Sequence, residues 1–553
     1  MSYFDVDVHS RTITAANDEA QLWFDRGLVW TYAYCHEEAM RCFGKALDAD
    51  PDCAMAHWGL GYAAGPNYNF QWSHMDPKGK AKALGTGYDC AQAALALIDK
   101  VTAPEKALIE ALQARYPQRD PIEDQAPWNA DFRDAMRRAY AAHPHDLEIA
   151  CVFVESIMNV TPWRMWDLRT ATVAEGAGTA EAEAALDRAF ETEAAWRHPG
   201  LLHLHVHLME MSPHPERALK TGDVLRELVP HGGHLIHMPT HIDILCGDYR
   251  DTLHWNEKAI EADLEFVERE GAMNFYTAYR IHNYHFAIYG AMFLGQYEAA
   301  MRNAQGLIDT TPEDLLRSES PPMADFIESY ISMKEHVMIR FGKWRELIVL
   351  PEVEEKDIWC VTHANRLYAQ GVAHAALGNV SEAEAVRARF LEAKAAVPES
   401  RLLHNNRCVD LLEIAEAMLD GELEYRKGNH EAAFAHLRRS VALDDALPYD
   451  EPWGWIQPTR HALGALLFEQ GRLEEAEAVY REDLGLGGGL SRAIIHPDNV
   501  WSLKGLVDCL KARGRAEGEE ARLLAMRLDF ALARADGRVA ASCFCAQAAM
   551  AAE

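Results

Sequence analysis

A helix-turn-helix spacing that recurs along the chain is the feature that most restricts its fold. The first clear unit combines Trp23, Gly27, Ala39, Phe43 and Pro51. Its small residues allow two helices to approach closely, its large residues fill the groove between them, and the proline ends the second helix. Such units bury their apolar surface against their neighbours, so the pattern predicts a superhelix of stacked helix pairs.

A glycine at the turn between the paired helices continues this pattern toward the C-terminus. Consecutive turn glycines lie 36 to 50 residues apart, so the later units are longer and less regular than the first. The segments between them are rich in Ala, Leu, Glu and Arg at helical spacing, and no alternating strand pattern is present. The glycines are Gly247, Gly295, Gly342, Gly378, Gly428, Gly471 and Gly514.

The first unit resembles the tetratricopeptide (TPR) repeat of 34 residues, in which Gly27 and Ala39 occupy the small positions 8 and 20. The resemblance implies an all-α, TPR-like α-solenoid of antiparallel helix pairs. We expect N-terminal repeats over 1–145, central histidine-rich repeats over 146–300, C-terminal repeats over 301–533 and a frayed Ala-rich tail over 534–553. Prolines between 115 and 144 predict an irregular connection there.

Composition excludes several classes of function. The 553 residues include 85 acidic and 54 basic side chains, and the formal charge of −31 disfavours binding to nucleic acid or to anionic lipid. The N-terminus has no signal-peptide pattern, and no apolar run is long enough to span a membrane. Eleven cysteines without a CxxC pair predict reduced thiols and a cytoplasmic protein, and we expect Cys543 and Cys545 not to bind a metal.

The strongest functional signal is a cluster of histidines. Residues 198–285 hold 12 of the 26 histidines, where a uniform spread would place about 4. Without using histidine to set the register, seven of the nine groove-facing positions 2, 5 and 9 in three successive repeats are His. They are His203, His207, His234, His237, His241, His282 and His285, with Glu210 at position 12 and Tyr289 at position 9.

This pattern predicts a transition-metal site on the concave face. Histidines at i and i+4, as in His203/His207 and His237/His241, can converge on one ion, and Glu210 can add a carboxylate from the same face. We expect a divalent metal (Fe, Cu or Zn, which spacing does not distinguish), with His234 and His282 completing one or two sites. Pro239 should kink the helix that carries His237 or delay its start.

The predicted chemistry is that of a metalloenzyme acting on a small polar substrate. Glu155 is the candidate general base, and His285 and Tyr289 are further catalytic candidates. Water activation and O₂ chemistry both stay open. The alternative is a non-enzymatic module that binds a partner peptide or an anion in a His/Tyr-lined groove, which His336, Tyr368 and His461 would extend. Motifs for nucleotide, hydride or serine-hydrolase chemistry are absent from the sequence.

Longer segments carry a second resemblance. His198-Pro-Gly-Leu-Leu-His203 and Gly233-His-Leu-Ile-His-Met-Pro-Thr-His241 resemble a group of largely uncharacterised bacterial TPR proteins, which typically have Ser in place of Thr240. Tyr449-Asp-Glu-Pro452 and Tyr480-Arg-Glu-Asp-Leu484 match the same group. The resemblance implies the solenoid fold over most of the chain and brings no reaction with it.

Overall fold

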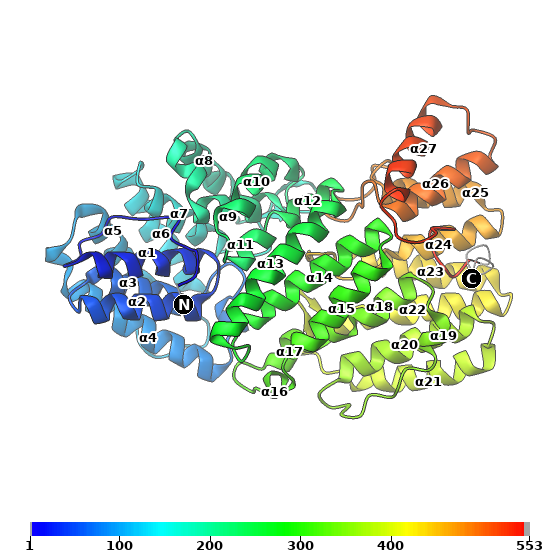
Figure 1. Cartoon of the computed structure of the whole chain (residues 1–553), viewed down its shortest axis with the longest axis horizontal. Coiled ribbons are helices and arrows are strands. Elements are labelled where there is room, and N and C mark those ends of the chain that lie inside the picture. Colours follow the sequence, from blue (N-terminus) through cyan, green and yellow to red (C-terminus); the bar gives the residue numbers. More distant parts are fainter. Residues whose placement is uncertain (1–2, 547–553) are drawn as a thin grey trace. The chain divides into compact units, whose positions relative to one another are not determined.

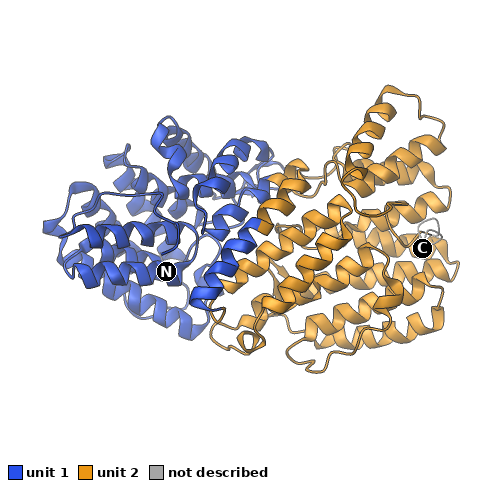
Figure 2. Ribbon diagram, viewed as in Figure 1, with its two compact units in different colours: residues 1–242, 258–271 blue, residues 243–257, 272–553 orange. Residues whose placement is uncertain are grey.

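The computed structural model describes residues 3–546, which form an all-α protein of antiparallel helix pairs (Figure 1). The predicted fold class is therefore confirmed. The described chain divides into two compact units (Figure 2). Within the described residues, unit 1 comprises 3–242 and 258–271, and unit 2 comprises 243–257 and 272–546.

Unit 1 consists of helical hairpins with one short β-ribbon, β1 (Trp166–Asp167) and β2 (Thr172–Val173). Its helices are α1 (Asp18–Tyr32), α2 (His36–Ala49), α3 (Ala54–Ala64), α4 (Pro77–Ala96), α5 (Ala103–Arg115), α6 (Ala126–Ala142), α7 (Leu147–Met158), α8 (Thr179–Phe190), α9 (Pro199–Met209), α10 (Leu219–Leu228) and α11 (Gly233–His237). Helices α12 (Thr240–Cys246) and α13 (Tyr249–Glu270) each contribute residues to both units.

Unit 2 continues the helical pairs and has one further ribbon, β3 (Leu402–Leu403) and β4 (Asn406–Arg407). Its helices are α14 (Thr277–Leu294), α15 (Tyr297–Thr310), α16 (Glu313–Leu316), α17 (Met323–Ile327), α18 (Met333–Arg340), α19 (Trp344–Leu347), α20 (Cys360–Ala376), α21 (Val380–Ala396), α22 (Cys408–Arg426), α23 (His430–Asp445), α24 (Thr459–Glu469), α25 (Leu473–Asp483), α26 (Val500–Ala512) and α27 (Glu519–Leu532).

The repeat pattern explains how the helices pack. Phe43 on α2 is buried, and its ring fills the space beside Gly27 on α1 and Gly59 on α3, where a Cβ would lie only 2.5 Å from the ring. The turn glycines predicted from the sequence all have positive φ, from 67° to 83°. This left-handed conformation favours glycine, which is why the turns between paired helices select it.

The C-terminal tail corrects an expectation. Residues 534–546 pack against unit 2 instead of fraying, while residues 547–553 lie outside the described part of the chain. The Asp536 carboxylate accepts the backbone N–H groups of Tyr297 (2.9 Å) and Glu298 (2.8 Å) at the start of α15. Cys543 and Cys545 form a disulfide, although the sequence predicts reduced thiols, and the other nine cysteines take part in no disulfide within residues 3–546.

Candidate metal centre

Helix α9 carries the first predicted histidine pair and is positioned by its own N-terminus. His198 caps the helix, because its Nδ1 accepts the Leu201 N–H at 3.2 Å and Pro199 occupies the first turn. The Nε2 of His198 donates to Glu148 on α7 at 3.0 Å. Burial acts to raise the pKa of Glu148, but His9 and His198 hold it well below its ordinary value. This ion-pair network anchors α9 to α7.

Close helix packing also depends on Gly200 at the start of α9. A Cβ at this position would lie 2.6 Å from the Cys151 Sγ on α7 and 2.7 Å from the Tyr32 ring on α1. Glycine therefore lets three helices meet where the histidines begin.

Both ring nitrogens of His198 are engaged by Leu201 and Glu148, so this residue caps α9 and anchors it to α7.

Three histidines from two helices form a buried triangle in unit 1. His203 and His207 on α9 and His234 on α11 each place a ring nitrogen within 4.8 Å of the other two. Their exposed fractions are between 0 and 1%. Ligands of one tetrahedral ion lie about 3.3 Å apart, because metal–nitrogen bonds are roughly 2.0–2.1 Å long. The triangle therefore needs only a modest contraction to hold one ion.

Two of the three histidines in this triangle, His203 and His207, are oriented by acceptors behind their rings. His203 forms a hydrogen bond to the backbone of Tyr32, and no residue in the described part of the chain bonds its buried Nε2. His207 donates from Nδ1 to the Glu210 carboxylate, at 3.0 Å from Oε1. Since a carboxylate only accepts, the proton sits on Nδ1 and the lone pair on Nε2. Burial lowers the pKa of His203 to about 3, so its imidazole is neutral.

Glu210, which the sequence suggested as a metal ligand, hydrogen-bonds to two of the histidines. Its Oε2 also accepts Nδ1 of His241, at 2.9 Å, so one carboxylate holds two histidines from behind. The Nε2 of His241 lies 2.7 Å from the Nε2 of His237, which forms a second pair beside the triangle. Carboxylates in this outer position are common behind metal-bound histidines, where they fix the tautomer and the ring orientation.

The helix is interrupted at Pro239, as the sequence predicts. Helix α11 ends at His237 and α12 begins at Thr240, so His237 and His241 do not share one regular helix. Their rings nevertheless meet, with centroids 4.7 Å apart.

Three aromatic residues border the triangle, and of these the sequence suggested only Tyr68, which belongs to an aromatic loop expected to cap the groove. The Tyr34 ring lies over His203 (centroid distance 4.7 Å) and His234 (5.2 Å). Tyr68 and Trp163 contact His207, with ring centroids 4.8 and 5.7 Å away. Together they make an apolar wall around the nitrogens.

Two of these aromatic residues have unusual backbone conformations. Tyr34 has φ 52° and Trp163 has φ 56°, the left-handed region that residues with a Cβ rarely adopt. Such conformations often persist where surrounding structure requires a particular side chain. Tyr34 lies at the turn between α1 and α2, a position that glycine occupies in the later repeats. The presence of Tyr instead of Gly at this turn is the sequence signal that could have identified Tyr34 as part of the site.

Glu155, the predicted general base, is buried on α7 and is engaged elsewhere. The Tyr62 hydroxyl donates to its carboxylate, and a hydrogen bond joins it to the backbone of Tyr68. Burial raises the pKa of Glu155 to about 8, so the carboxyl is protonated at neutral pH.

The remaining predicted residues belong to α14 of unit 2. The His282 ring contacts Phe286 (centroids 5.0 Å apart) and His404 (5.2 Å), and His285 contacts Tyr330 (5.1 Å). Tyr289 is buried, and its ring stacks on Phe293 at 4.3 Å. The structure thus gathers His203, His207, Glu210, His234, His237 and His241 within unit 1 and describes His282, His285 and Tyr289 within unit 2.

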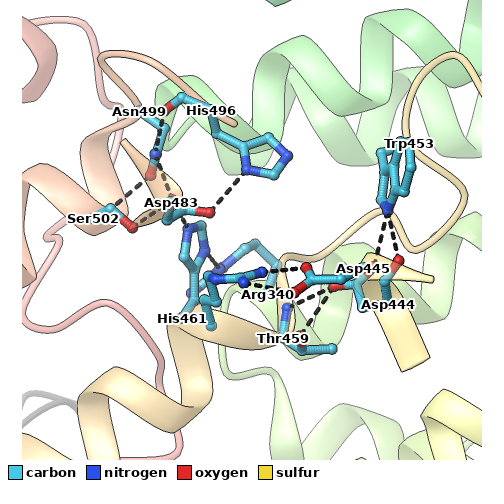
Figure 3. A network of polar contacts seen from close by, with 11 residues as sticks. Arg340, Asp444, Asp445, Trp453, Thr459, His461, Asp483, His496, Asn499 and Ser502 are labelled. Carbon is cyan, nitrogen blue, oxygen red and sulfur yellow. Dashed lines mark hydrogen bonds and ion pairs between the residues drawn. The ribbon is translucent and has the colours of Figure 1, made fainter. Parts of the chain in front are cut away.

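Unit 2 contains a separate polar network around the buried Asp483 (Figure 3). Its carboxylate accepts from His461 (3.0 Å), His496 (2.8 Å), Asn499 (3.0 Å) and Ser502 (2.6 Å). Burial acts to raise the pKa of Asp483, but the two histidines hold it well below its ordinary value. This network joins α24, α25 and α26, so its role is to hold these helices together.

The Asp483 network continues to Arg340 on α18. Arg340 donates to the Nδ1 of His461 at 2.9 Å, so both nitrogens of this histidine are engaged. His461 and Tyr368 both line one small pocket in unit 2. His336 is buried against Trp455 and is not among the lining residues of this pocket.

Comparison with known proteins identifies no family for this chain. No family model matches the chain, and no curated protein matches its sequence. Among solved structures, the human IFIT1 dimer with m7Gppp-AAAA is 12% identical with a TM-score of 0.31, over 92% of this chain and 89% of that one. The Cut9–Hcn1 hetero-tetramer of the APC/C is 11% identical with a TM-score of 0.28, over 97% and 96%. The described residues include no helix long and apolar enough to cross a bilayer.

Proposed function

We propose that unit 1 binds a divalent transition metal, Fe, Cu or Zn, between His203, His207 and His234. The observation that carries this proposal is the triangle of buried nitrogens, of which two are oriented from behind by a backbone and a carboxylate acceptor. Buried polar atoms are normally hydrogen-bonded, whereas the Nε2 of His203 has no such partner among residues 3–546. The His237–His241 pair is the place for a second ion.

His203, His207 and His234 would hold the metal, which would supply Lewis-acid activation of water or, as Fe or Cu, reactivity toward O₂. Tyr34, Tyr68 and Trp163 pack against the histidine rings, and in this proposal they would form the apolar surroundings of a small substrate. Glu210 fixes the ring orientation of His207 and His241. Glu155 is not assigned the base role in this proposal, because its carboxyl already accepts the Tyr62 hydroxyl and burial raises its pKa to about 8, which favours the protonated form.

Elemental analysis of protein made without a histidine tag tests the proposal. We expect about one metal per chain, or two if the His237–His241 pair is filled, either as purified or after reconstitution under reducing conditions. The double variant His203→Ala/His207→Ala should lose the metal, whereas His205→Ala should retain it, because the Nδ1 of His205 is bonded to Thr221 at 2.8 Å. Fewer than about 0.2 metal ions per reconstituted wild-type chain would contradict metal binding.

A second candidate function, binding of an extended peptide by unit 2, is favoured by how unit 2 holds its own tail. Arg340 donates to the Ser542 carbonyl, and the Ser542 hydroxyl lies 2.6 Å from the Tyr480 hydroxyl. Arg426 donates to the Cys545 carbonyl, and Phe544 packs on Trp501. Contacts to backbone carbonyls combined with an aromatic anchor are a common way to bind peptides.

A peptide-binding experiment tests this second candidate. A chain ending at residue 533 should bind a fluorescent peptide of residues 534–546 in an anisotropy titration, and Arg340→Met should weaken that binding. The full chain should bind the peptide less tightly, because its own segment already occupies the surface. A truncated chain that keeps its helical circular dichroism but binds no peptide would contradict the idea.

A further inference from the structure

The last helix, α27, presents an apolar face that solvent reaches. Leu523, Met526 and Phe530 are 52%, 51% and 67% exposed. Their spacing of three and four residues puts them on one side of the helix, while Ala521, Leu524 and Leu528 are buried. Helix α27 packs against α26 in unit 2 (Figure 1). End repeats of helical arrays need a polar outer face for solubility, so an apolar one indicates a partner.

The charges that flank this face make it complementary to itself. Glu519 begins α27, four residues before Leu523, and Arg534 lies in the turn that follows the end of α27 at Leu532, so a charged residue flanks each end of the stripe. Glu519 and Arg534 are exposed, and neither forms an ion pair with another residue between positions 3 and 546. One end of the stripe is therefore acidic and the other basic.

We propose that two copies of this chain associate through α27 in an antiparallel arrangement, which we call the α27 interface. Pairing about the midpoint between Met526 and Arg527 places Leu523 of each copy against Phe530 of the other. The same midpoint places Glu519 against Arg534 at both ends, so one two-fold axis satisfies the apolar and the charged pairs together. A parallel pairing would place like charges together and is disfavoured.

The size of the face sets the expected strength. Stable interfaces bury at least about 1,000 Å² in total, and a single helix stripe provides less than most. We therefore expect a reversible dimer with a dissociation constant of about 1–100 μM. The apolar centre should supply most of the affinity, and the exposed ion pairs should mainly set the direction.

Sedimentation velocity of the full chain between about 1 and 200 μM tests the proposal. The weight-average sedimentation coefficient should rise toward that of a dimer, and Phe530→Glu should keep the chain monomeric throughout the range. Val349→Glu is the matched control, because Val349 is 76% exposed elsewhere in unit 2. A chain that stays monomeric, or self-association that Phe530→Glu leaves unchanged, would overturn the proposal.

Charge reversal and crosslinking test the direction of pairing. Glu519→Arg or Arg534→Glu alone should weaken association by about 3- to 10-fold, and the double variant should restore it. A mixture of Leu523→Cys and Phe530→Cys chains should form mixed disulfide dimers through the new thiols, in excess of those formed by either variant alone. Crosslinking that favours Leu523→Cys with itself would indicate parallel pairing and overturn the antiparallel arrangement.

Discussion

Glu210 accepts a hydrogen bond from Nδ1 of His241 at 2.9 Å, across 31 residues of sequence. The same carboxylate accepts Nδ1 of His207, so one buried acidic group sets the tautomer of two histidines on different helices. Glu210 is 1% exposed, and these two bonds account for why a carboxylate is tolerated there. It links the histidine triangle to the His237–His241 pair.

Replacing Glu210 with Gln tests its role behind the ligands. The amide can accept from one Nδ1 but presents its NH₂ group to the other, so one imidazole should lose its orientation. We expect metal affinity to fall by roughly 10- to 100-fold, measured by competition with a chromophoric chelator. Glu216→Gln is the control, since that residue is exposed in the same segment. Unchanged affinity in Glu210→Gln would exclude this role.

Replacing Tyr34 separates its backbone conformation from its side chain. Loss of the buried ring should destabilise the protein by roughly 3 kcal/mol in either Tyr34→Ala or Tyr34→Gly. Because φ is 52°, the Gly variant should be more stable than the Ala variant by about 1 kcal/mol, as measured by urea unfolding. Both should bind metal more weakly than the wild type. An Ala variant at least as stable as the Gly variant would contradict the strained turn.

The raised pKa of Glu155 predicts that the free energy of unfolding depends on pH. Burial raises its pKa from 4.5 to about 8, so the folded state holds a proton that the unfolded state releases between these values. Stability should therefore fall as pH rises through this window, and the fall should level off above about pH 8. Glu155→Gln removes the ionisation, so its stability relative to the wild type should increase from pH 5 to pH 8 in denaturant titrations. A constant difference would contradict the raised pKa.

Gly200→Ala tests the close approach at the start of α9. The added Cβ would lie 2.6 Å from Cys151 and 2.7 Å from Tyr32, so the helices must separate. We expect a loss of about 1–3 kcal/mol in unfolding free energy, with weaker metal binding because α9 shifts. Gly44→Ala is the matched control: no atom lies within 4 Å of its Cβ, and helix propensity should raise stability by about 1 kcal/mol. Equal changes in the unfolding free energies of the two variants would show that α9 can accommodate a Cβ at position 200, which would contradict the prediction.

The repeat architecture follows from the sequence because its signals are local. Turn glycines require positive φ, and Gly27 and Phe43 require each other across one helix pair, so neither depends on distant contacts. The His203/His207 pair shares one regular helix and is predicted for the same reason.

The finer arrangement of the candidate centre depends on contacts that spacing does not contain. Helical spacing puts Glu210 on the same face as His207, but its bonds to two Nδ1 atoms depend on how α9 and α12 pack. The aromatic wall depends on Tyr34, which holds a left-handed turn that its residue type disfavours. The tail was expected to fray because it is rich in Ala, yet Asp536 and Ser542 fasten it by polar contacts to distant helices.

Anomalous X-ray diffraction from a crystal of the metal-reconstituted protein tests the central claim most directly. The metal-binding account predicts a peak roughly 2.0–2.2 Å from one nitrogen each of His203, His207 and His234. Glu210 should remain bonded to His207 and His241. A fully reconstituted crystal without a peak at this triangle, or with its peaks only elsewhere, would contradict it.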